Sequence, residues 1–337
     1  MRVRSRAPLR ISFAGGGTDV SPYCDENTGA VLNSTINRYV YITLEPMKGE
    51  NYTVESLDYG IVLESNINEE IIFDGQLNVV KGVIKKFKKD YSLKEGFRLS
   101  IFSDAPPGSG LGSSSTLVVA LIDAFREWMN LPLTLYEIAN LAVEIERKDV
   151  GIIGGKQDQF AAAFGGFNFI EFFKDKTTVN SLRLREEIKN ELECSILLCY
   201  VGGSRLSNHI IESQTKRYMS GENFAYLNNI KTLANEMKKC LIKGDLVRFG
   251  RLLDEEWKNK KLLTEGITNQ RIDKIYKEVI AKGALGGKIS GAGGGGYMFF
   301  FAEQDYREEI LKSLKNLNVE VVPFSFVEKG VISWKLQ

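Results

Sequence analysis

A run of glycines and serines constrains this chain more than any other segment. The run, PPGSGLGSSS over residues 106–115, lies between an expected strand at 97–102 and an apolar stretch expected to be helical over about 114–128. Glycines let backbone N–H groups approach an anion without a Cβ in the way. The following helix adds unpaired N–H groups and the positive end of its dipole. The segment is therefore predicted to hold phosphate groups.

The spacing of this run excludes two other phosphate-binding loops. A Walker A loop needs a Lys followed by Ser or Thr at its end, and none follows Gly112. A dinucleotide-binding fingerprint needs a G-x-x-G closure, whereas Gly108, Gly110 and Gly112 alternate. Taken alone, the run leaves two interpretations open: a phosphate cradle, or a structural turn that ends in a serine helix cap.

Length and composition bound the remaining choices. A chain of 337 residues is too long for one ordinary core, so we expect two domains, 1–180 and 181–337. The net charge of +1 gives no general attraction to nucleic acid or to an anionic membrane, and we expect neither as a partner. No apolar run is long enough to cross a bilayer, and the four scattered cysteines indicate reduced thiols in a cytoplasmic protein.

The scarcity of histidine excludes further enzyme classes. His209 is the only histidine, so a zinc site with several histidines is impossible, and a Ser-His-Asp hydrolase would have to use this one residue.

Hydrophobic periodicity predicts an α+β protein, because strand pairs and helices are mixed along the chain. The expected strands lie at 40–44, 52–63 (a hairpin), 97–102, 195–201, 285–289 and 297–301. The expected helices lie at 77–91, 114–128, 134–147, 157–164, 207–219, 224–242, 246–263 and 270–282.

Three ordered segments resemble the motifs of the GHMP kinases, a family that includes galactokinase, homoserine kinase, mevalonate kinase and phosphomevalonate kinase. They are APLRISFAGGGTD at 7–19, PPGSGLGSSS, and KISGAGGGG at 288–296. The resemblance implies ATP and Mg²⁺, and a two-domain fold with the active site in the cleft. The N-terminal domain would be like domain 2 of ribosomal protein S5, and the C-terminal domain ferredoxin-like. The loop residues expected to bind ATP are Pro107, Gly108, Ser109, Gly110, Leu111, Gly112, Ser113, Ser114 and Ser115.

The same resemblance assigns catalytic groups. Asp158, in GGKQDQ, matches the aspartate that contacts the transferred hydroxyl, and Arg10 matches the cation that pairs with it. Glu146 and Ser114 match the Mg²⁺ ligands, while Glu144 is the lesser choice. The alternatives are structural: Asp158 would favour a helix dipole, and Arg10 would form a surface salt bridge.

Asp19 matches the acidic position with which sugar kinases hold substrate hydroxyls, although GGGTD departs from the GEHTD-like pattern of galactokinase. An alternative is that Asp19 only caps the following helix. The residues expected to contact the sugar are Gly16, Gly17, Thr18, Asp19, Lys156, Gln157, Arg205, His209 and Gly291.

The segments GGKQDQFAAAFGGFN, AGGGTD and GGSRLSNHII resemble one branch of the family more than galactokinase. That branch phosphorylates the anomeric hydroxyl of D-glycero-D-manno-heptose 7-phosphate. The resemblance implies a small sugar phosphate as partner and a monomer or homodimer. The alternatives are an L-fucose or other sugar 1-kinase, a decarboxylase of the diphosphomevalonate type, and a sugar sensor without enzymatic activity.

Overall fold

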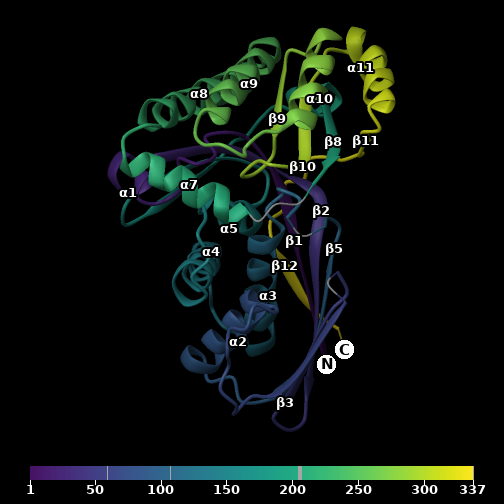
Figure 1. The fold of residues 1–337 in the computed structure, drawn as a ribbon. Coiled ribbons are helices and arrows are strands. Elements are labelled where there is room, and N and C mark those ends of the chain that lie inside the picture. The colour runs from purple at the N-terminus through teal and green to yellow at the C-terminus, as the bar shows by residue number, and fades with distance from the viewer. Residues whose placement is uncertain (59, 107, 204–206, 337) are drawn as a thin grey trace.

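The computed structural model describes residues 1–58, 60–106, 108–203 and 207–336. These residues form two sheets, and helices pack against both (Figure 1). The first sheet has the strand order β12-β1-β2-β5-β3-β4, with β6 paired to β2 and β7 to β6. Among the described strands of this sheet, β3 and β5 alone pair in parallel. The strands of this sheet are β1 (Arg2–Ala14), β2 (Gly29–Met47), β3 (Asn51–Ser56), β4 (Ile61–Asn66), β5 (Gly96–Ser103), β6 (Phe167–Phe172), β7 (Thr177–Ser181) and β12 (Ile332–Leu336).

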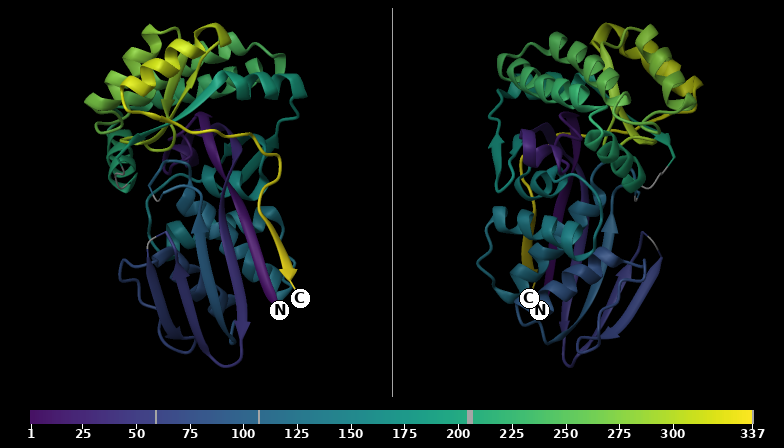
Figure 2. Two further views of the ribbon diagram at one scale, coloured as in Figure 1. Left: turned by 90° about the vertical axis from the view of Figure 1, so that its right-hand side faces the viewer. Right: turned by 60° about the vertical axis from the view of Figure 1, so that its left-hand side comes forward.

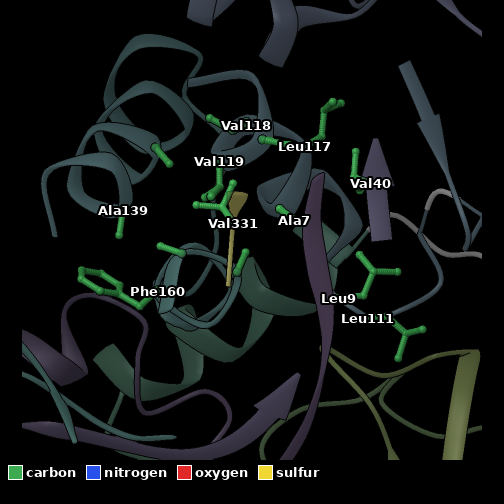
Figure 3. Close-up of a cluster of buried hydrophobic side chains, with 14 of the residues drawn as sticks. Ala7, Leu9, Val40, Leu111, Leu117, Val118, Val119, Ala139, Phe160 and Val331 are labelled. Carbon is green, nitrogen blue, oxygen red and sulfur yellow. The ribbon is translucent and has the colours of Figure 1, made fainter. Parts of the chain in front are cut away.

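Helices cover one face of this sheet, as the two views of Figure 2 show. They are α2 (Asn78–Asp90), α3 (Ser113–Met129), α4 (Leu135–Glu144) and α5 (Gln157–Phe164). The central helix is α3, which packs on β1, β2 and β12 through an almost continuous run of buried residues. Figure 3 shows this core, with Leu117, Val118 and Val119 of α3 beside Ala7, Leu9 and Val331. The start of α3, where the phosphate loop ends, is thereby fixed on the sheet.

The second sheet is antiparallel, with the order β11-β8-β10-β9. Its strands are β8 (Ile196–Gly202), β9 (Gly286–Ile289), β10 (Gly296–Phe301) and β11 (Glu320–Val321). Every residue of β10, GYMFFF, is buried, because the strand lies between β8 and β9 and its aromatic rings contact Phe13 of β1, Phe249 and Tyr276. The remaining helices are α1 (Tyr23–Asn27), α6 (Glu186–Ser195), α7 (Ser207–Met219), α8 (Phe224–Lys243), α9 (Leu246–Lys261), α10 (Gln270–Ala281) and α11 (Gln304–Asn316).

Most expected elements are present, and the differences include the following three. The helix expected over 134–147 ends at Glu144 and continues as a π-helical turn, Ile145–Asp149. The hairpin of β6 and β7 was not expected, although FNFIEF is rich in β-forming residues. Finally, β12 pairs with β1, so the end of the chain returns to the first sheet. Within the described residues, no helix is long and apolar enough to cross a membrane.

Candidate active site

A cleft of about 260 Å³ brings together the motifs of the first sheet and residues of α7, α9 and the loop after β9. Its lining residues are Arg10, Gly16, Gly17, Asp19, Val20, Gly108, Gly110, Gly112, Ser113, Ser114, Ser115, Glu146, Arg147, Ile152, Ile153, Gly154, Gly155, Gln157, Asp158, Asn208, Ile211, Gln214, Lys260, Gly291 and Ala292.

The phosphate loop is held against the third glycine motif by backbone contacts. Gly110 has a φ of +83°, and a Cβ there would lie 2.4 Å from the carbonyl oxygen of Ser290. A Cβ at Gly291 would lie 2.8 Å from the carbonyl oxygen of Gly110. The amide of Tyr297 also donates to the Ser109 carbonyl at 2.9 Å. The two loops need glycine because their backbones touch, so the third motif shapes the floor of the cleft.

Arg10 of β1 and Asp158 of α5 form a bidentate ion pair in the cleft. Nε of Arg10 lies 2.7 Å from Oδ1 of Asp158, and its Nη2 lies 2.9 Å from Oδ2. The third nitrogen, Nη1, donates to the Gly110 carbonyl at 2.6 Å and to Ser290 Oγ at 3.3 Å. The guanidinium is buried, so this is no surface salt bridge. The pair is attached directly to the phosphate loop.

Glu146 lies on the π-helical turn, a distortion that is common at functional sites. Its buried carboxylate accepts from Ser115 Oγ at 3.1 Å and from Gln159 Nε2. Burial raises the pKa of this carboxyl, and the charge of Arg147 partly opposes the shift. The hydroxyl that donates to Glu146 therefore belongs to Ser115. Ser114, which was expected to accompany Glu146, is exposed and lines the cleft.

Asp19, at the end of the GGGTD turn, also lines the cleft and is almost fully buried. Its carboxylate accepts from the amide of Gly17 at 3.0 Å, from the amide of Gln157 at 3.1 Å and from Gln157 Nε2 at 3.3 Å. A Cβ at Gly155 would lie 2.0 Å from Oδ2 of Asp19, so the loop before α5 can approach only because that residue is glycine. Asp19 thus ties the GGGTD turn to the helix that carries Asp158.

Lys260 of α9 is the main residue of the cleft that the sequence analysis missed. Its Nζ donates to the Gly16 carbonyl at 2.8 Å, and the side chain is buried. Burial, and next the charge of Lys288, lowers the pKa of Lys260 to about 8. Gln214 of α7, also missed, donates to the Gly17 carbonyl at 3.3 Å. Neither helix carries a glycine motif, so only the hydrophilic residues on otherwise apolar helix faces could have indicated them.

Arg147, also missed, follows Glu146 in the sequence. Its guanidinium donates to the carbonyls of Ile152 and Gly155 at 3.2 and 2.6 Å. It therefore holds the loop that leads into α5.

The expected site residues divide into three groups. Those that line the cleft are Arg10, Gly16, Gly17, Asp19, Gly108, Gly110, Gly112, Ser113, Ser114, Ser115, Glu146, Gln157, Asp158 and Gly291. Those that do not line it are Thr18, Ser109, Leu111, Lys156 and His209. Pro107 and Arg205 lie outside the described residues.

The residues outside the lining have visible reasons for their positions. The hydroxyl of Thr18 donates to backbone carbonyls of Gly15 and Ala30, and Leu111 packs in the core. Lys156 does not line the cleft, and its Nζ lies 3.2 Å from Oδ1 of Asp25. His209 is exposed on α7, from which Asn208, Ile211 and Gln214 line the cleft.

Two protein-family models match this chain, one in its N-terminal half and one in its C-terminal half. The model of the GHMP kinases N terminal domain matches residues 78–166, and the model of the GHMP kinases C terminal domain matches residues 237–319. A Campylobacter jejuni protein named D-glycero-alpha-D-manno-heptose 7-phosphate kinase is 42% identical over 336 residues, which cover 99% of each chain.

The chain belongs to the GHMP kinases.

Two further relatives support this assignment to the GHMP kinases. A crystal structure described as a D-glycero-D-manno-heptose 1-phosphate kinase from Bacteroides thetaiotaomicron superimposes with a TM-score of 0.84, at 39% identity over 99% of each chain. The Bacteroides fragilis L-fucokinase/L-fucose-1-P guanylyltransferase is 25% identical over 97% of this chain and 38% of its own length. The expected fold and the expected enzyme class, an ATP-dependent kinase, are confirmed.

Proposed function

We propose that this GHMP kinase transfers the γ-phosphoryl group of ATP to the anomeric hydroxyl of D-glycero-D-manno-heptose 7-phosphate. The observation that carries the proposal is the ion pair of Arg10 and Asp158. Arg10 is buried and donates to the phosphate loop at Gly110, and both residues line the cleft. A kinase needs a carboxylate and a cation where the acceptor hydroxyl meets the γ-phosphate.

The phosphate end of the cleft fits ATP. The glycines of the loop and the N-terminus of α3 present backbone N–H groups to the phosphates. Glu146, with Ser114 and Ser115, offers the oxygen ligands that Mg²⁺ prefers, and Mg²⁺ commonly binds through one or two carboxylates plus phosphate oxygens. When bound, the ion would neutralise the charge of the phosphates.

The transfer step follows from the positions of Arg10 and Asp158. Asp158 accepts the proton of the anomeric hydroxyl as the sugar oxygen forms its bond to the γ-phosphorus, and the bond from that phosphorus to the bridging oxygen breaks to release ADP. Arg10 orients the carboxylate with two hydrogen bonds, and its charge stabilises the anionic oxygens. The anomeric hydroxyl suits this base because it is more acidic than an ordinary alcohol.

The names of the two most similar relatives above support a heptose phosphate as the acceptor. An L-fucose 1-kinase is the second candidate, because the Bacteroides fragilis relative covers almost the whole chain at lower identity.

We further propose that residues 1–180 with β12 form one domain and the rest a second, since β7 and β8 belong to different sheets. We expect the reaction in the cytoplasm, where ATP is available, and a monomer or homodimer.

A panel of acceptors tests the proposal. The purified protein is incubated with ATP, Mg²⁺ and, separately, heptose 7-phosphate, L-fucose, mannose 6-phosphate and mevalonate diphosphate, while ADP and carbon dioxide are measured. We expect ADP release to be fastest with heptose 7-phosphate, without carbon dioxide. Faster turnover of L-fucose would support the second candidate, and no turnover of any sugar would contradict a sugar kinase.

A further inference from the structure

The three glycines of the GGGTD turn are not equivalent. Gly15 has a φ of +88°, and a Cβ there would lie 1.9 Å from the Ala30 carbonyl oxygen. Gly17 has a φ of +104°, and its Cβ would lie 2.8 Å from Gln214 Nε2. Both positions therefore require glycine for the fold. Gly16 has no positive φ and no close contact, so the backbone alone does not explain why it is glycine.

The space beside Gly16 is surrounded by polar atoms. A Cβ at Gly16 would lie 3.7 Å from Gln157 Nε2, 3.7 Å from Ser12 Oγ and 3.8 Å from Lys260 Nζ. Gly16, Gln157 and Lys260 all line the cleft. A side chain at Gly16 would occupy a polar corner of the site.

These polar groups have unused hydrogen-bonding capacity. Lys260 Nζ carries three donors when charged and makes one hydrogen bond within the described part of the chain, to the Gly16 carbonyl. Gln157 Oε1 and Ser12 Oγ have no partner among the described residues, although their side chains are only 7% and 2% exposed. Buried polar atoms are normally satisfied, so this corner is built to receive a polar ligand group.

We propose that Gly16, Gln157 and Lys260 form a subsite for one hydroxyl group of the acceptor sugar, with Lys260 as the donor that selects for it. The proposal rests on the sugar kinase function proposed above and assigns this end of the cleft to the sugar. The hydroxyl accepts from Lys260 Nζ and donates to Ser12 Oγ, both of which lie beside the space at Gly16, while Gln157 Nε2 forms its third wall. A sugar that lacks this hydroxyl would leave the first two groups buried and unpaired.

A hydroxyl fits this corner better than a phosphate. The corner has about the size of one methyl group, whereas a phosphate carries three oxygens that need donors. The charges near Lys260 are mixed, since Lys288 and Arg10 are cations and Asp19 and Glu256 are carboxylates, so charge alone does not select a phosphate. Gln157 Nε2 already donates to Asp19 at 3.3 Å, so the corner offers few donors for three phosphate oxygens. Lys260 should therefore bind the sugar itself and not a distal phosphate.

Two variants test the subsite by different routes. Lys260→Met removes the donor at similar length, and Gly16→Ala fills the corner while its backbone conformation suits alanine. We expect each to raise KM for heptose 7-phosphate about 10- to 100-fold and to leave KM for ATP within about twofold. Lys258→Met is the control, because Lys258 lies on the same helix with an exposed side chain and pairs with Asp254 outside the cleft.

The outcomes separate this proposal from the proposed function. Sugar binding is also measured by calorimetry without ATP, so the subsite is tested even if turnover fails. Weaker sugar binding in Gly16→Ala and Lys260→Met, with folded protein by circular dichroism, supports the subsite. Unchanged sugar binding in both variants overturns the subsite. The proposed kinase function then still stands if the wild-type protein phosphorylates the sugar. A wild-type protein that neither binds nor phosphorylates any sugar overturns both.

A comparison of mannose with mannose 6-phosphate tests the choice of a hydroxyl. If Lys260 binds a hydroxyl, Lys260→Met weakens the binding of both sugars by the same factor. A loss confined to the phosphorylated sugar would show that Lys260 binds the distal phosphate and would overturn the proposal.

Discussion

The two ends of the cleft are built differently. At the phosphate end, the loop of residues 108–115 is one continuous motif, and its proposed function depends on backbone N–H groups and on Gly110, whose Cβ would collide with the Ser290 backbone. At the sugar end, the side chains of Asp19, Gln157 and Lys260 come from segments that are far apart in the sequence. A site formed by backbone groups tolerates few sequences, so its motif can be recognised in the sequence. A site formed by side chains can change its residues when the substrate changes, so no motif marks it.

The Arg10–Asp158 pair lies between these ends, and its loss should have the largest effect. We expect Asp158→Asn to lower kcat about 10³- to 10⁴-fold, because the amide cannot accept the proton. Steady-state kinetics measures this, with binding of a non-hydrolysable ATP analogue to show that the site remains formed. Asp175→Asn, an exposed carboxylate, is the control. A folded Asp158→Asn variant with nearly wild-type kcat would remove the residue from the mechanism.

Alanine in place of Gly110 should damage the phosphate end selectively. Its Cβ would lie 2.4 Å from the Ser290 carbonyl oxygen at a φ of +83°, so the two loops must move apart. We expect KM for ATP to rise about 10- to 100-fold, with a smaller change in KM for the sugar. The reverse order, with the sugar more affected than ATP, would refute the division of the cleft into two ends.

Replacing Glu146 should change the metal dependence. We expect Glu146→Gln to raise the Mg²⁺ concentration needed for half-maximal activity about tenfold, since one carboxylate ligand is lost. Glu144→Gln is a matched control, because Glu144 lies two residues earlier and pairs with Lys86 at 3.1 Å. Identical Mg²⁺ titrations for the Glu146 variant and the wild type would exclude Glu146 as a metal ligand.

The pH dependence should be smaller and confined to the sugar end. Lys260 has a pKa lowered to about 8 by burial and by the charge of Lys288, to which Arg10 adds. Glu256 and Asp19 oppose this shift. Lys260 is charged below this pKa and neutral above it, so its charged donor is lost as the pH rises.

Between pH 7 and 9 we therefore expect kcat/KM for the sugar to fall by at most about tenfold. The profile is measured at saturating ATP. In Lys260→Met this fall should disappear. A fall of equal size in that variant would assign the titration to another group.

Sequence reasoning was most successful where a local pattern determines the structure. The helices expected over 114–128 and 157–164 agree with α3 and α5, because hydrophobic periodicity is local. The contact of Arg10 with Asp158 was implied by the resemblance to the GHMP kinases, since the two residues are 148 positions apart in the sequence. Lys260 was not predicted, because on α9 it is one lysine in the run WKNKK, and only tertiary packing buries it. The hydroxyl that donates to Glu146 is that of Ser115, because adjacent residues of a helix point in different directions. Ser114 lines the cleft and stays a proposed Mg²⁺ ligand.

³¹P NMR of the product shows which hydroxyl of the sugar receives the phosphoryl group. We expect heptose 7-phosphate to give a bisphosphate whose new phosphorus couples to the anomeric proton, and Asp158→Asn to give no such signal. A new phosphate that couples to any other proton of the sugar would rule out transfer to the anomeric hydroxyl.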